Sequence, residues 1–169
     1  MSIAWSQLTN MNIRTAESAE DIEIVRRLFR EYETSLGINL CFQNFESELA
    51  GLPGKYAPPE GRLYLAFEDG QVAGCAGLRK FEDGICELKR LYVPSRYRGR
   101  GVGRQLTLQA TNDAREIGYV RMRLDTLPSM GRAQELYRTL GFKPIAAYTN
   151  NPVVGAAFLE LILTQDGAI

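Results

Sequence analysis

The chain has 169 residues, 45% of them apolar, which is enough for one domain whose core needs no metal or disulfide. Its 20 Lys and Arg residues balance its 20 Asp and Glu residues, and this zero net charge argues against a nucleic-acid-binding protein. Histidine is absent, which excludes Ser-His-Asp triads, Cys-His pairs and histidine-ligated metal sites, and we expect no metal centre.

The cysteines and the apolar pattern bear on the compartment. Three cysteines cannot all pair, and Cys75 and Cys86 lie in apolar, strand-like runs, so we expect reduced, buried thiols. Cys41 is the one of the three considered for reactivity. The N-terminus lacks a basic-then-apolar leader pattern, and no apolar run reaches the roughly 18 residues of a membrane span. We therefore expect a single domain over residues 1–169, in the cytoplasm, with no membrane partner.

The first half of the chain predicts helices followed by strands. Ser18 and Asp21 fit a capping box before apolar residues at helical spacing, which predicts a helix over 19–36 ending at Gly37. A second short helix is expected from about 42 to 52, and the three prolines and three glycines of residues 51–61 predict a loop. A strand near 12–15 and three more at 63–68, 72–80 and 85–93 follow from alternation and turn residues, the last three as an antiparallel meander.

The second half alternates helices and strands. A helix is predicted from 101 to 117, a strand from 120 to 126, and then a helix capped by Ser129 and ended by Gly141. Strands are expected at 142–148 and 156–163, and dimerisation is plausible if the last of these is an exposed edge. The predicted fold class is α/β (α+β), with a mixed, mostly antiparallel sheet of six to seven strands flanked by about four helices.

A glycine-broken basic turn, with the sequence YVPSRYRGRGVGR at residues 92–104, separates a predicted strand from a predicted helix. Gly99, Gly101 and Gly103 let a ligand approach the backbone, and the helix offers unpaired N–H groups and the positive end of its dipole. Between Glu87 and Asp113 there is no acid, and there are six cations: Lys89, Arg90, Arg96, Arg98, Arg100 and Arg104. The turn therefore predicts a diphosphate site. It lacks the G-x-G-x-x-G of dinucleotide-binding turns and the Gly-Lys-Ser/Thr of a P-loop.

Three segments in order resemble the GNAT superfamily of N-acyltransferases. Residues 98–103 are similar to its R/Q-x-x-G-x-G/A signature, and the A-x-x-L-Y of residues 133–137, with Gly141-Phe142 after it, is similar to its second signature. Residues 87–93, ELKRLYV, resemble its central cofactor-contacting strand. The resemblance extends from about Ile13 onward.

The resemblance implies an N-acetyltransferase that moves an acetyl group from acetyl-CoA directly to a primary amine of a small molecule or peptide, in a ternary complex. It makes Tyr137 the general acid for the departing thiolate, and Glu87 is the candidate base, acting directly or through water. Met130 stands where the family often has an asparagine, so one amide contact to the cofactor is missing. The residues that would bind the cofactor are Leu91, Tyr92, Val93, Arg98, Gly99, Arg100, Gly101, Val102, Gly103, Arg104 and Met130.

Plainer interpretations stay open. Tyr137 at helical spacing fits a core residue, and Glu87 fits a solvent-facing strand residue paired with Lys89 or Arg79. The chain could also bind coenzyme A as a sensor or scaffold without catalysis, whereas a nucleic-acid-binding domain is the weaker alternative. The first two helices and residues 51–61 are expected to form the acceptor wall, where Glu46, Glu48 and Glu60 could attract a cationic acceptor.

Overall fold

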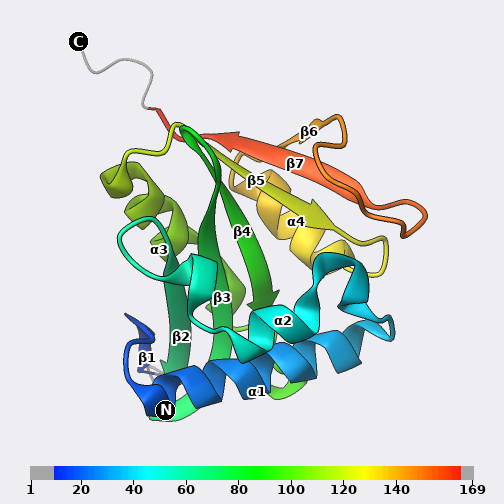
Figure 1. Cartoon of the computed structure of the whole chain (residues 1–169). Coiled ribbons are helices and arrows are strands. Elements are labelled where there is room, and N and C mark those ends of the chain that lie inside the picture. Colours follow the sequence, from blue (N-terminus) through cyan, green and yellow to red (C-terminus); the bar gives the residue numbers. More distant parts are fainter. Residues whose placement is uncertain (1–9, 165–169) are drawn as a thin grey trace, which may run out of the picture.

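A seven-stranded sheet in the order β1-β2-β3-β4-β5-β7-β6 forms the centre of the computed structural model, which describes residues 10–164 apart from the side chains of residues 42 and 43 (Figure 1). Neighbouring strands are antiparallel except β4 and β5, which run parallel. This confirms the predicted fold class. The strands are β1 (Met11–Thr15), β2 (Arg62–Glu68), β3 (Gln71–Glu82), β4 (Ile85–Tyr92), β5 (Arg121–Thr126), β6 (Lys143–Ile145) and β7 (Ala157–Ile162).

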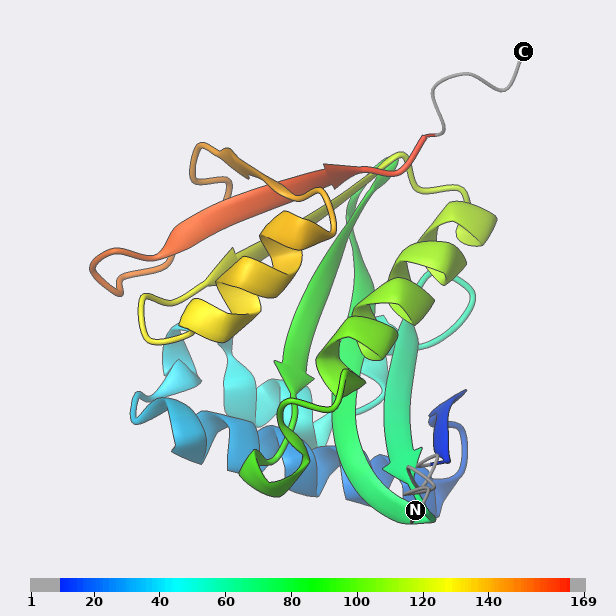
Figure 2. The same ribbon diagram turned by 180° about the vertical axis from the view of Figure 1, so that it is seen from behind.

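Helices cover both faces of the sheet. α1 (Ala19–Leu36) and α2 (Phe45–Ala50) lie on one face, together with the 3-10 turns η1 (Leu40–Gln43) and η2 (Gly54–Tyr56) (Figure 1). α3 (Val102–Ile117), which follows the 3-10 turn η3 (Ser95–Tyr97), and α4 (Gly131–Thr139) lie on the other face, as Figure 2 shows. Within residues 10–164 no helix combines the length and apolar character needed to cross a membrane.

The ends of α1 form as its local sequence predicts. The Ser18 side chain accepts a hydrogen bond of 3.0 Å from the Asp21 backbone N–H, and Gly37 ends the helix with φ +66°. One face of the helix packs its apolar side chains on β2 and β3 in a cluster that includes Val25, Leu28, Phe29, Leu63, Leu65 and Cys75. The first half of the chain is therefore anchored to the sheet through this helix.

A second apolar cluster fills the opposite side, between the sheet and α3. Leu106, Ala110 and Ala114 of α3 pack against sheet residues that include Leu78 and Met122. Cys75 and Cys86 are fully buried, as predicted, and burial raises the pKa of the Cys86 thiol to about 12, whereas Cys41 is exposed. The core therefore consists of two layers, one on each side of the sheet.

Three boundary predictions are wrong. The helix expected over 42–52 is split, because Asn44 adopts the left-handed conformation (φ +56°) between η1 and α2. Met130, not Ser129, is the N-cap of α4, without a side-chain capping bond. The strand expected over 142–148 pairs only at Lys143–Ile145. β7 is not the edge of the sheet, because β6 pairs with it at Phe158 to Glu160 and is itself the edge strand; the possible homodimer stays a prediction.

Candidate active site

A β-bulge in β4 shapes the middle of the sheet. Between the pairs Gly77↔Lys89 and Cys75↔Tyr92, two steps along β3 oppose three steps along β4, and the extra residue, Arg90, has φ +59°. Arg90 consequently reaches the α2 side, where its Nε lies 2.9 Å from a carboxylate oxygen of Glu48. The bulge thus places two consecutive cations, Lys89 and Arg90, among the walls of the cavities described next.

Strands β4 and β5 separate directly after Glu87. They pair only from Ile85 to Glu87 with residues 121–123, and Figure 1 shows them diverging beyond that point. Among the described strands none pairs with β4 on this side after Glu87, so its backbone groups are available to a ligand. A narrow channel of about 40 Å³ occupies the gap, and its walls include residues 88–91, residues 125–127, Met130, Ala133 and Tyr137.

The basic turn leads from the end of β4 into α3. Gly99 (φ +78°) and Gly101 (φ +82°) adopt left-handed conformations that favour glycine, and a Cβ at either would meet no protein atom within 4 Å. Gly101 is also the N-cap of α3 and has no side chain with which to cap it, and the first turn holds no acid. No side-chain cap from the described residues therefore occupies the backbone N–H groups of the first turn, and the diphosphate site stays a prediction.

Two arginine side chains of the turn form hydrogen bonds within the protein, and a third is exposed to solvent. Arg98 donates from Nε to the Val93 carbonyl at 3.0 Å, and Arg100 donates to the buried carboxylate of Glu68 at 2.9 Å. Arg104 is exposed on the first turn of α3. Gly103 packs against α4: a Cβ at this position would lie 3.5 Å from the Leu136 side chain. Arg98 and Arg100 thus stabilise the turn as well as adding positive charge to it.

Tyr137 and Met130 reach the channel from α4. Tyr137 is only 6% exposed, packs with ring centroids 5.5 Å from Phe142, and lines the channel. Burial raises the pKa of its phenol, so the group stays protonated at neutral pH and can donate a proton. The Met130 sulfur accepts a hydrogen bond from the Thr126 hydroxyl at 3.6 Å. The geometry is compatible with the role expected for Tyr137.

Glu87 is buried, in contrast to a solvent-facing strand residue. It is 4% exposed, and its two carboxylate oxygens accept hydrogen bonds from Arg79 Nε at 3.1 Å and from the Tyr148 hydroxyl at 2.9 Å. Burial, with the adjacent Glu87 charge, raises the pKa of Tyr148, which therefore remains a donor. The pairing with Arg79 was one of the predicted alternatives. The carboxylate is thus held in a fixed position on the α2 side of the sheet.

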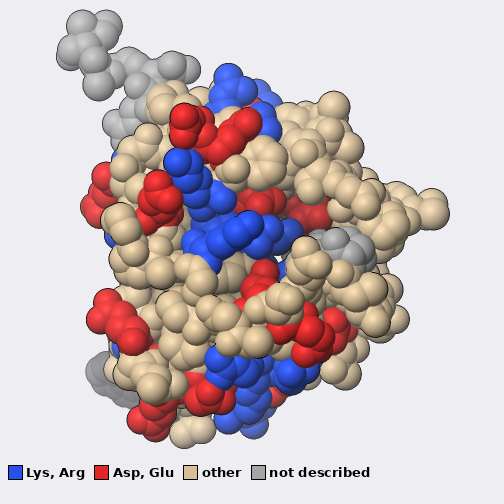
Figure 3. Space-filling model, viewed as in Figure 1, with Lys and Arg blue, Asp and Glu red and all other residues tan. Residues whose placement is uncertain are grey.

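Glu87 lines a second, wider cavity of about 500 Å³ beneath α2 and η2. The residues of its wall also include Glu48, Lys55, Tyr56, Arg79, Lys89, Asp125, Thr149 and Asn150. Figure 3 shows Lys and Arg side chains gathered across the middle of this face, with acidic side chains on either side. The wall thus combines both signs of charge around a space of ligand size.

The channel and the cavity share two wall residues, Lys89 and Asp125. Lys89 Nζ lies 3.1 Å from Asp125 Oδ1, and Asn151 donates to the other Asp125 oxygen at 3.0 Å. Burial lowers the pKa of Lys89; it also opposes ionisation of Asp125, but the Lys89 charge and hydrogen bond lower the pKa of that carboxyl overall. The sequence did not predict the pairing of Lys89 with Asp125. The spacing of two residues between Glu87 and Lys89 indicates only that these two side chains share one face of the strand.

The diverging strands, the uncapped helix terminus and the two cavities that share Lys89 and Asp125 are the arrangement of an acyl-group transferase. The sequence profile of the acetyltransferase (GNAT) family matches residues 22–142, and the chain belongs to that family. An uncharacterized N-acetyltransferase of Schizosaccharomyces pombe is 33% identical over 159 residues, covering 93% of this chain and 98% of that protein.

Solved structures show the same fold at lower identity. A GNAT-family acetyltransferase of Staphylococcus aureus superposes with a TM-score of 0.77 at 19% identity, covering 92% of this chain and 100% of the other. A Salmonella typhimurium protein described as an acetyltransferase, and solved with acetyl-CoA, gives a TM-score of 0.69 at 20% identity, covering 94% of this chain and 96% of the other. The chain is an acyltransferase of this family.

Proposed function

We propose that the protein transfers an acetyl group from acetyl-CoA to a primary amine by direct transfer in a ternary complex. The observation that carries the proposal is that the narrow channel and the wide cavity lie on either side of one buried pair, Lys89 and Asp125, which lines both. A thioester that enters along the channel and an amine that enters through the cavity would approach each other there. Such proximity supplies much of the rate acceleration in a reaction between two bound substrates.

The donor side matches coenzyme A at two points. The first-turn amides of α3, with the glycines and arginines of residues 98–104, suit the diphosphate, whose charge the helix dipole also stabilises. The unpaired backbone of Leu91, continued through Tyr92 and Val93, suits the amide groups of the pantetheine arm, which would lie beside β4 as an added strand. Met130 and Tyr137 would lie near the thioester end.

The chemical step needs one proton acceptor and one proton donor. Glu87, directly or through water, accepts the proton that the amine loses as its nitrogen bonds to the thioester carbonyl carbon. Tyr137 donates its phenolic proton to the sulfur as the carbon–sulfur bond breaks, so no enzyme-bound acyl group forms. The proton balance closes when Glu87 and Tyr137 exchange protons with solvent. The buried phenol is suited to this task because it is protonated at neutral pH.

The test combines calorimetry with coenzyme A and thiol release from acetyl-CoA in the presence of a panel of amines. Tyr137→Phe is expected to lower kcat about 100-fold and to leave coenzyme A affinity unchanged, since the ring still packs on Phe142. Tyr119→Phe is the matched control, because its hydroxyl bonds to the Glu60 carbonyl away from the channel. Coenzyme A binding without thiol release on any amine would favour the sensor alternative, and absence of binding would overturn the donor assignment.

A further inference from the structure

The wall of the acceptor cavity carries both acidic and basic side chains, and among the described residues the acidic ones are all paired whereas some basic groups are not. Glu48 contacts Arg90 at 2.9 Å and Arg79 at 3.4 Å, Glu87 contacts Arg79 at 3.1 Å, and Asp125 contacts Lys89 at 3.1 Å. Each carboxylate in the wall is therefore already neutralised by a cation. Glu46 and Glu60, which the sequence also suggested as attractants, pair with Arg30 and Lys80. These pairs leave little negative charge to attract a cationic acceptor.

Positive groups remain available on the same wall. Lys55, on η2, is exposed, and within residues 10–164 it forms no ion pair. Arg79 uses Nε and Nη1 for the two glutamates, which leaves the N–H groups of Nη2 for a ligand. Its guanidinium lies 5.9 Å from the Tyr56 ring centroid, which restricts its position. The cavity therefore has an excess of donors that suit an anion.

The Tyr56 hydroxyl adds a neutral donor. Tyr56 is 2% exposed and lines the cavity, and its hydroxyl, beside Glu48, has no partner at ordinary hydrogen-bond geometry in the described part of the chain. Burial raises the pKa of this phenol, so it keeps its proton. The nearby Glu48 carboxylate interacts with this hydroxyl only outside ordinary hydrogen-bond geometry, so a ligand oxygen placed closer would satisfy the donor better. The wall thus offers three kinds of donor: guanidinium, ammonium and phenol.

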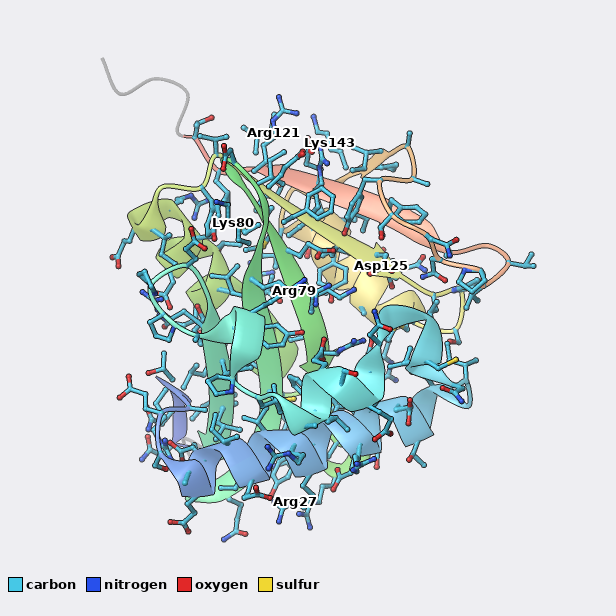
Figure 4. The ribbon with its side chains drawn as sticks, viewed as in Figure 1. Arg27, Arg79, Lys80, Arg121, Asp125 and Lys143 are labelled. Carbon is cyan, nitrogen blue, oxygen red and sulfur yellow. The ribbon has the colours of Figure 1, made fainter. Side chains whose placement is uncertain are left out.

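The register of the sheet brings this anion site close to the proposed base. Arg79 and Glu87 are direct partners across β3 and β4, and they are in hydrogen-bond contact. Figure 4 shows Arg79 in the middle of the sheet, with Asp125 on the neighbouring part that borders the donor channel. A ligand whose anionic group meets Arg79 would therefore hold an amine only a few bonds away near Glu87.

We propose that the acceptor is an amino acid, that is, a primary amine with a carboxylate a carbon or two away, and that Arg79, Lys55 and Tyr56 bind this carboxylate. The inference rests on the proposed function, since it names the acceptor class of that site. The cavity volume of about 500 Å³ has room for a free amino acid. The ammonium form would enter beside Glu87 and lose a first proton through it to solvent; the neutral amine then presents its nitrogen to the channel, and the ionised Glu87 accepts the second proton as the new bond forms.

The test compares acceptors that differ in the carboxylate alone: amino acids, their carboxamides and the matching decarboxylated amines. Thiol release is measured for each set, and binding of each to the complex of protein and coenzyme A is measured by calorimetry. We expect the acids to exceed the amides by at least about 100-fold in kcat/KM, because polar groups of a site that are left unpaired reject an analogue strongly. Equal or better turnover with amides, decarboxylated amines or polyamines would overturn the inference and leave the proposed function intact.

Two variants locate the site. Lys55→Gln is expected to raise KM for the acids about two- to fivefold, as for an exposed charge, and Arg79→Gln about tenfold or more. KM for the amides should stay unchanged in Lys55→Gln and should rise less than KM for the acids in Arg79→Gln, because Arg79 also contacts Glu87. Lys80→Gln is the control, because Lys80 follows Arg79 in β3 but lies outside the cavity wall and pairs with Glu60 and Asp83. If acids and amides lose equally in both variants, these cations do not bind the carboxylate.

Should turnover fail with every amine, binding of acids but not amides would still support the inference, and equal binding of both would overturn it.

Discussion

Lys89 and Asp125 form a buried ion pair, 3.1 Å from Nζ to Oδ1, between two strands that have already separated. The Lys89 side chain is 5% exposed and the Asp125 side chain is 6% exposed. Where the β4 and β5 backbones no longer share hydrogen bonds, this pair links them through their side chains. It also forms the boundary between the donor channel and the acceptor cavity. A structural link and the proposed reaction centre therefore coincide.

Asp125→Asn tests this link. The substitution keeps the shape but leaves the Lys89 ammonium buried beside a neutral amide, so we expect a loss of about 3 kcal/mol in the free energy of unfolding. Urea denaturation measures the loss. Glu135→Gln is the control, because its ion pair with Arg138 is exposed, and it should change stability by less than about 0.5 kcal/mol. Equal, small losses in both variants would show that the buried pair contributes no more than a surface pair.

Glu87→Gln tests the proposed base. The amide retains an oxygen for the Arg79 hydrogen bond but cannot accept the amine proton, so we expect kcat to fall about 100-fold with coenzyme A affinity unchanged. Tyr148→Phe removes only the neighbouring hydrogen bond to the same carboxylate and should lower kcat much less. Thiol-release kinetics with single acceptors measure both. A larger loss in Tyr148→Phe than in Glu87→Gln would assign the base to another group.

The sequence predicted the features that depend on neighbouring residues. The Ser18 cap, the glycine-rich turn before α3 and the meander of β2, β3 and β4 all follow from short patterns, and the structure contains them. The basic turn was recognisable because its glycines, cations and helix start lie within about ten residues of one another. Local rules of turns and caps are sufficient for such features.

The remaining parts of the site depend on contacts between distant residues. Lys89 meets Asp125 from 36 positions away, and Glu87 meets Tyr148 from 61 positions away. No local pattern indicates that β4 and β5 separate after Glu87 or that Arg90 bulges, because both depend on how whole strands pack. The sequence also did not indicate the positive character of the acceptor cavity. It suggested that Glu46, Glu48 and Glu60 attract a cation, but in the structure each of them is paired with a Lys or Arg residue.

Asp21 is expected to make stability depend on acidic pH. The hydrogen bond from Arg14, 2.5 Å long, lowers the pKa of Asp21 from 3.8 to about 2. Because the pKa is lower in the folded state, the stabilisation is present above pH 4 and is lost as the pH falls towards 2. Arg14 is 45% exposed, so solvent screens the pair and we expect about 1 kcal/mol. Urea unfolding of Asp21→Asn from pH 5 to pH 2 should show a weaker pH dependence than the parent; identical slopes would contradict the assignment.

Gly101→Ala tests whether the backbone of the turn binds the diphosphate. Gly101 has φ +82°, and a side chain there costs about 1 kcal/mol or shifts the backbone, which would misalign the first N–H groups of α3. Gly118→Ala is the matched control, because Gly118 ends the same helix with φ +111° and also has open space around a Cβ. Both variants should lose similar stability in urea.

Only Gly101→Ala should weaken coenzyme A binding, by about tenfold or 1.4 kcal/mol, as measured by calorimetry. Dephospho-coenzyme A, which retains the diphosphate, should show the same loss, whereas pantetheine, which lacks it, should bind both variants alike. This difference separates a diphosphate contact from a general disturbance of the channel. If Gly118→Ala weakened coenzyme A binding as much as Gly101→Ala, the effect would come from the stability of α3 and not from the geometry of its first turn.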